Sequence, residues 1–287
     1  MSLRGLTLHP RTQLYAEKFA ANLPQGLIVE GPIGSGVATV AHALAEDSGS
    51  QAFVLLPKKK QGNELVISPE DGSIVIEDIR QLYEQTRTKQ SEEQTYIIDT
   101  GVKSMTVAAQ NAFLKLLEEP RAGVHFIIAT HRADQLLSTI VSRCQTLSLL
   151  PITDEQTTDV INSLGIDDRT KRTRLAFVGR GRPALIRRLA ADGELYDARV
   201  KIMTDAKTLL GNDTFAKLKI IHTYRDNRAD ATTLLDDMNY QLQTVVKSHP
   251  DLSASRRIAK TIDKQLEARE RIGGGGNIRI QLASVVL

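Results

Sequence analysis

The residues that most directly suggest chemistry lie in one glycine-rich stretch of the amino-terminal region. A β-branched run is followed by Gly31, Gly34 and Gly36 and then by an alanine-rich segment, which is the layout of a phosphate-binding P-loop, G-x-x-x-x-G-K-[ST]. Val37 stands at the lysine position and Ala38 at the Ser/Thr position. The motif's lysine contacts the β- and γ-phosphates and its hydroxyl binds Mg²⁺. The sequence therefore predicts a degenerate P-loop that does not bind nucleotide tightly.

Two weaker interpretations of this stretch stay open. The loop's backbone N–H groups and the positive end of the following helix attract an anion even without the lysine. Alternatively, the glycines form a turn that never bound phosphate.

Asp99 is the second candidate, because it closes an apolar run in the manner of a Walker B strand. In that motif the aspartate orients Mg²⁺, and a catalytic glutamate commonly follows it. Here Thr100 follows, and the segment up to Ser104 adds no acid. Asp99 is interpreted as a vestigial site residue, with a simple capping role as the alternative. No metal site is expected.

Composition limits the classes of protein to consider. The chain has 287 residues, of which 41% are hydrophobic and 25% charged, with a net charge of +3. These values are typical of a globular protein of two or three domains. No apolar run is long enough to span a membrane, and the amino terminus lacks a signal-peptide core. The single cysteine, Cys144, favours a reducing cytoplasm. Scarce aromatic residues (4%) argue against a base-stacking platform.

Strand and helix patterns alternate through about residue 150. The candidate strands lie at residues 27–30, 53–56, 95–98, 125–130 and 146–149. Such alternation predicts a parallel sheet with helices on both faces. After Pro151 only helical patterns follow. We therefore predict an α/β domain over residues 1–151, a small helical lid domain over 152–192 and an all-α carboxy-terminal collar bundle over 193–287.

Some local predictions concern single segments. Lys58-Lys59-Lys60, with Gly62 and Asn63, is predicted to be a solvated loop. Between Arg169 and Arg188 the chain has eight Lys/Arg residues and no acid. This basic block, residues 169–188, is interpreted either as a contact for DNA, a nucleotide or an acidic neighbour, or as a solvated helical face. The remaining local predictions are an inward-facing Ile79, Leu82 and Tyr83, a helix over about Asp134–Val141, and a helix from Thr106 that Pro120 ends.

Several longer motifs resemble one family, the AAA+ clamp-loader subunits of bacterial DNA polymerase III, and within it the delta-prime group. The motifs are Leu8-His9-Pro10, Gly72 to Arg80, Ala109 to Pro120, Phe126 to Thr130, and Ser142-Arg143-Cys144. The resemblance covers the first 190 residues well, and the carboxy-terminal bundle more weakly. It implies a AAA+ fold.

The resemblance also implies a site residue. In the family, the arginine of the Ser-Arg-Cys triplet reaches the ATP of a neighbouring subunit. Arg143, next to Ser142, would then be an arginine finger supplied in trans, although a surface salt bridge is the alternative. The implied partners are gamma/tau-type ATPase and delta-type subunits and, through the assembled complex, the sliding clamp and primed DNA. No cofactor is expected, and the four-cysteine zinc lobe of many relatives is absent.

Two other functions stay open. One is an active AAA+ ATPase in which a basic residue such as Lys115 or Arg182 replaces the P-loop lysine. Ala184 falls about where ATP-hydrolysing relatives have a second sensor arginine. The other is a stand-alone DNA-binding protein that uses the basic block.

Overall fold

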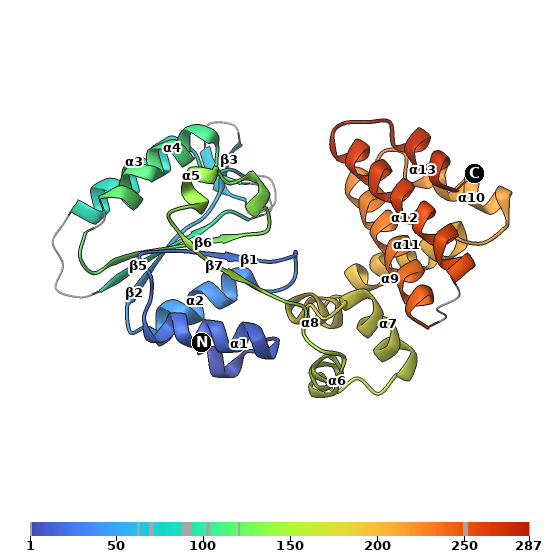
Figure 1. Ribbon diagram of the computed structural model, residues 1–287, viewed down its shortest axis with the longest axis horizontal. Coiled ribbons are helices and arrows are strands. Elements are labelled where there is room, and N and C mark those ends of the chain that lie inside the picture. Colours follow the sequence, from blue (N-terminus) through green and yellow to red (C-terminus); the bar gives the residue numbers. More distant parts are fainter. Residues whose placement is uncertain are drawn as a thin grey trace. The chain divides into compact units, whose positions relative to one another are not determined.

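The computed structural model describes residues 2–61, 64–68, 72–87, 93–101, 104–119, 121–248 and 252–286. The chain forms two compact units, Met1–Ala190 and Ala191–Leu287 (Figure 1). The boundary predicted between residues 151 and 152 lies inside the first unit, and the division into three domains stays a prediction. Some residues to which a prediction refers lie outside the described residues: Gly62, Asn63 and Pro120, and Val102 and Lys103 in the segment between Asp99 and Ser104.

A five-stranded parallel sheet forms the centre of the first unit. Its strands are β1 (Gly26–Glu30), β2 (Gln51–Leu55), β5 (Gln94–Asp99), β6 (Val124–Thr130) and β7 (Gln145–Ser148), in the order β2-β5-β6-β1-β7. Central strand β1 is buried up to its last residue, Glu30, as expected for a parallel sheet that is covered on both faces. The predicted parallel sheet is confirmed. The carboxyl ends of all five strands lie at one edge, which we call the carboxyl edge, and their beginnings lie at the opposite, amino edge.

Helices cover both faces of this sheet. The helices of the first unit are α1 (Pro10–Ala21), α2 (Val37–Asp47), α3 (Ile76–Arg87), α4 (Val107–Glu118), α5 (Ser138–Val141), α6 (Asp154–Ser163), α7 (Arg169–Gly179) and α8 (Pro183–Ala191). Figure 1 shows α1 and α2 on one face and α3, α4 and α5 on the other. Two separate cores result. The first joins Val29 to the α2 residues Val37 and Leu44, and the second joins Ile28 to Phe113 of α4.

Local signals explain where several helices begin. The hydroxyl of Thr106 accepts a hydrogen bond from the N–H of Ala109 at the start of α4. Thr153 and Gln156 form a reciprocal capping box at the start of α6. The carboxylate of Asp168 accepts hydrogen bonds from two N–H groups of α7. Each cap gives a partner to backbone N–H groups that have none within the helix.

Three local predictions are wrong. The expected loop at Lys58-Lys59-Lys60 is strand β3 (Lys58–Gln61), paired antiparallel with β4 (Glu64–Ile67), because ladder hydrogen bonds come from the backbone whatever the side chains are. Tyr83 is 43% exposed, because α3 buries the Ile79 and Leu82 stripe beside it. The helix expected over about Asp134–Val141 is interrupted, with a 3₁₀ turn at Ala133–Gln135 before α5.

The second unit is a helical bundle. It comprises α9 (Gly193–Leu209), α10 (Thr214–Thr223), α11 (Arg228–Ser248), α12 (Leu252–Gly273) and α13 (Ile278–Val286). The last helix packs on α12 and α10 and buries Ile278 and Leu282 in the bundle's core. Asp237 is completely buried and forms a two-contact ion pair with Arg199, which is 11% exposed. Within the described residues, every helix is too short or too polar to cross a lipid bilayer.

Candidate functional site

The degenerate P-loop lies at the carboxyl edge, between β1 and α2. Gly34 and Gly36 have φ values of +87° and +93°, a backbone region that side-chain-bearing residues rarely adopt. The loop geometry therefore requires these glycines. Val37, at the lysine position, is 2% exposed and belongs to the first core. As the first residue of α2, Val37 turns its side chain into this core and supplies no charge to the loop.

The loop also satisfies some of its polar groups internally. The N–H of Ser35 donates to the carbonyl of Pro32 at 2.9 Å, and the N–H of Gly31 donates to Thr130. The Nδ1 atom of His131 lies 2.8 Å from the carbonyl oxygen of Gly31. A P-loop cradles phosphate with backbone N–H groups of this kind. The Ser35 N–H, which already bonds Pro32, is not available for that purpose.

Helix α8 packs directly on the loop. The N–H of Leu185 donates to the carbonyl of Gly34 at 3.1 Å, and a Cβ added to Gly34 would lie 2.6 Å from the Cβ of Leu185. Arg182 donates through Nη1 to the carbonyl of Ile33 at 3.4 Å, and through Nε and Nη2 to carbonyls at the end of α7. No local pattern predicts these contacts, which cover the loop with the chain's own backbone and side chains.

Asp99 ends β5 at the same carboxyl edge. Its Oδ1 accepts a hydrogen bond from the N–H of Gly101 at 2.9 Å. Thr100 is buried, and its hydroxyl donates to an acceptor on β6, either the carbonyl of Ala129 or the hydroxyl of Thr130. The carboxylate of Asp99 thus shapes the turn after β5. In the described part of the chain, no group of three or more His, Cys, Asp or Glu side chains lies close enough together to hold a metal ion.

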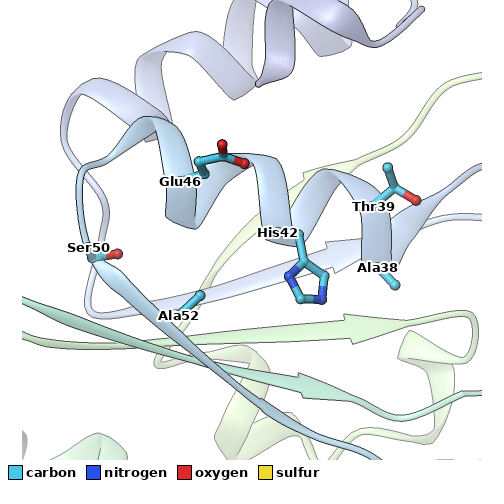
Figure 2. Close-up of a pocket in the computed structure, with 6 residues that line it drawn as sticks. All are labelled: Ala38, Thr39, His42, Glu46, Ser50 and Ala52. Carbon is cyan, nitrogen blue, oxygen red and sulfur yellow. The ribbon is translucent and has the colours of Figure 1, made fainter. Parts of the chain in front are cut away.

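A shallow hollow of about 600 Å³ lies beside the P-loop, along α2 and the start of β2. Its lining is Ala38, Thr39, His42, Glu46, Ser50 and Ala52 (Figure 2). Figure 2 shows the Ala38 methyl and the Thr39 hydroxyl pointing in different directions from α2. None of the loop glycines lines this hollow. It therefore lies on the flank of α2 and is not the mouth of the P-loop.

Arg143 follows α5 at the surface, and its side chain is 40% exposed. Its Nη1 donates to the carbonyl of Thr139 at 3.0 Å, and its Nη2 lies 2.8 Å from Oε1 of Glu118, the last residue of α4. Ser142 is exposed, and its hydroxyl donates to the same Thr139 carbonyl. The salt-bridge alternative for Arg143 is therefore present within this chain. No local pattern predicts the contact with Glu118.

Arg143 and the P-loop occupy opposite edges of the sheet. Arg143 immediately precedes Cys144 and β7, and its carbonyl oxygen lies 3.4 Å from the position of a Cβ on Gly26, the first residue of β1. The P-loop follows Glu30, the last residue of that strand. The strand's length, about 13 Å at 3.3 Å per step, separates the two ends. Lys115, one turn before the end of α4, is at the amino edge with Arg143.

Cys144, the residue after Arg143, is a poorly reactive thiol. Burial raises the pKa of Cys144 to about 11, because a thiolate loses its hydration there. Its sulfur would be 2.8 Å from a Cβ on Gly26. Cys144 therefore fills space between α5 and β1.

Comparisons with known proteins find similarities that span these features. Residues 12–153, which include the degenerate loop, Asp99 and Arg143, match the family model described as DNA polymerase III, delta subunit. The DNA polymerase III subunit delta′ of Bacillus subtilis is 25% identical over 246 residues, which cover 77% of this chain and 74% of that protein. Both matches support a relationship to delta-prime-type clamp-loader subunits.

Two further similarities extend this result. The subunit delta′ of Haemophilus influenzae is 30% identical over 123 residues, which cover 42% of this chain and 37% of that protein. A RuvB mutant from Thermotoga maritima superposes with a TM-score of 0.51 at 17% identity, covering 86% of this chain and 84% of that one. At that identity the likeness concerns the fold alone, which is the AAA+ fold.

The basic block at 169–188 lies outside the range that the family model matches. The arginines of this block differ in their exposure and in their hydrogen bonds. Arg169, Arg174, Arg187 and Arg188 are exposed, whereas Arg182 is held by the backbone carbonyls at the end of α7 and in the P-loop. The block therefore combines structural and solvent-facing side chains.

Proposed function

We propose that this chain is a non-hydrolysing, delta-prime-type subunit of the DNA polymerase III clamp loader. It would supply Arg143 in trans to ATP bound by a gamma/tau-type neighbour while the complex loads the sliding clamp onto primed DNA. It would act in the cytoplasm, without a cofactor or an enzymatic activity of its own. Its helical unit, predicted as a collar, would join it to the ATPase and delta-type subunits.

The proposal rests chiefly on the placement of Arg143 relative to the chain's own loop. The guanidinium is exposed at the amino edge, whereas the P-loop lies at the carboxyl edge. An arginine in that position serves another subunit's nucleotide and not its own. A guanidinium is suited to this role because its planar fork of donors matches phosphate oxygens and offsets charge that develops in the transition state.

The alternative of an active ATPase has less support. Lys115 lies on the last turn of α4, at the edge away from the loop. Arg182 donates through Nε, Nη1 and Nη2 to backbone carbonyls of this chain. We therefore expect calorimetry of the isolated chain with Mg-ATP to detect no binding in the micromolar range. A micromolar Kd would favour the ATPase instead.

The stand-alone DNA-binding alternative has four exposed arginines in its favour, two on α7 and two on α8. Phosphate contacts of this kind give binding that weakens steeply with salt. We expect the purified chain to bind DNA only weakly. Strong, salt-dependent binding by the monomer would support the alternative.

The decisive experiment compares two arginine variants in a reconstituted loader. Arg143→Ala should leave assembly intact and slow hydrolysis at the one partner site that it faces, since arginine fingers contribute about 10³–10⁵ in rate in GTPases. Arg132→Ala is the matched control, because Arg132 is 48% exposed and paired with Asp134 but follows β6 at the carboxyl edge. Unchanged hydrolysis and clamp loading with Arg143→Ala would contradict the proposal.

A further inference from the structure

The guanidinium of Arg143 is held by two acceptors that come from two different elements. One is the carbonyl of Thr139 in α5, and the other is the carboxylate of Glu118 at the end of α4. The side chains of Arg143 and Glu118 are 40% and 49% exposed. The pair therefore lies at the surface, where a second subunit can reach it.

Both supporting elements are fixed to the interior. Helix α4 buries Phe113, whose ring meets that of Phe126 edge-on at 5.3 Å between centroids. The amide of the buried Gln110 ties α4 to the chain before α5, donating to Gln135 at 3.1 Å and accepting from the N–H of Leu137 at 2.7 Å. Glu118 and Thr139 are thus anchored partners, which restrict where the guanidinium points.

These contacts leave most of the guanidinium's hydrogen-bonding capacity available. Arginine carries five N–H donors. The contacts with Thr139 and Glu118 use two of them. An arginine side chain otherwise loses considerable rotamer freedom when it is fixed on a ligand. A side chain that is already held at its outer nitrogens loses less of that freedom on binding.

We propose that Glu118 is a positioning residue, which holds Arg143 in the orientation that meets a phosphate group of a nucleotide bound to the neighbouring subunit. This inference rests on the proposed function, because it presumes that Arg143 acts in trans. Glu118 itself touches no nucleotide in this scheme. Its effect should therefore appear in kcat at the partner site and not in the KM for ATP.

The test uses three variants of the full chain in the reconstituted loader. Glu118→Ala should lower kcat at the partner site about two- to fivefold, the rate equivalent of an exposed ion pair. Glu118→Gln keeps an acceptor for Nη2 and should lose less. Glu119→Gln is the matched control, since Glu119 is the adjacent exposed carboxylate and should leave kcat unchanged. In an Arg143→Ala background, Glu118→Ala should have no further effect.

The outcomes separate this inference from the proposed function. If Arg143→Ala leaves hydrolysis unchanged, the trans role is wrong. If Arg143→Ala slows hydrolysis but Glu118→Ala does not, only the positioning role is wrong. A higher kcat with Glu118→Ala would mean that Glu118 competes with the phosphate, which also overturns it. In the isolated chain, NMR of the Arg143 guanidinium should show slow rotation about the Nε–Cζ bond in the wild type and Glu119→Gln, and faster rotation in Glu118→Ala.

Discussion

Removing Arg199 should destabilise the helical unit far more than removing any exposed arginine. The carboxylate of Asp237 is completely buried, and two of its contacts are the Nη1 and Nη2 atoms of Arg199. In Arg199→Ala the charge would stay in the interior without its guanidinium. Breaking a buried ion pair from one side costs about 3–5 kcal/mol. That is a large share of the about 5–15 kcal/mol that stabilises a domain of roughly 100 residues.

The bundle contains a control for this experiment. Arg269 and Asp236 form an ion pair at 2.7 Å, but their side chains are 49% and 39% exposed. Arg269→Ala should cost less than about 1 kcal/mol, as exposed pairs do. Urea titration of both variants by circular dichroism measures the two losses. Equal losses, or a loss below about 1 kcal/mol for Arg199→Ala, would refute the argument from burial.

Two predictions concern the packing between α5 and β1. Burial raises the pKa of Cys144 to about 11 from 9.0, so iodoacetamide at pH 8 should alkylate the folded chain at least about 100-fold more slowly than the unfolded chain. Alkylation at the same rate in both states would contradict the raised pKa. Because the pKa of Cys144 is higher in the folded chain than in the unfolded chain, the thiol's contribution to stability is complete below pH 9 and is lost as the pH rises towards 11. Gly26→Ala places a Cβ 2.8 Å from the sulfur of Cys144 and should cost about 1–3 kcal/mol. Adding Cys144→Ala should restore part of that loss in thermal melts, and no recovery would show that the sulfur is not the obstacle.

The parts of the fold that the sequence predicted are those with local signals. Alternating apolar runs and helical spacing identified the parallel sheet, and glycine spacing identified a loop whose Gly34 and Gly36 adopt positive φ. Strand β3 was missed because its three lysines have little preference for strands. Its partner strand β4, an apolar segment that ends in two β-branched residues, was the available signal.

The contacts that refine the site could not be predicted, because they join distant parts of the chain. Leu185 meets Gly34 across about 150 residues, and Arg143 meets Glu118 across 25 residues. Neither contact leaves a periodic pattern in the sequence. The triplet around Arg143 indicated a role for this residue only through its family resemblance.

The two cores of the first unit are separated by the sheet, and this separation has a consequence for how the chain tolerates change. Val37 packs in the core under α1 and α2, whereas α4, which ends at Glu118, and α5, which precedes Arg143, are anchored in the core on the opposite face. Substitutions at sites so far apart, with no shared neighbours, affect stability independently. A sequence can therefore lose the charged residue of its loop, and fill that position with an apolar side chain, without disturbing the guanidinium at the other edge.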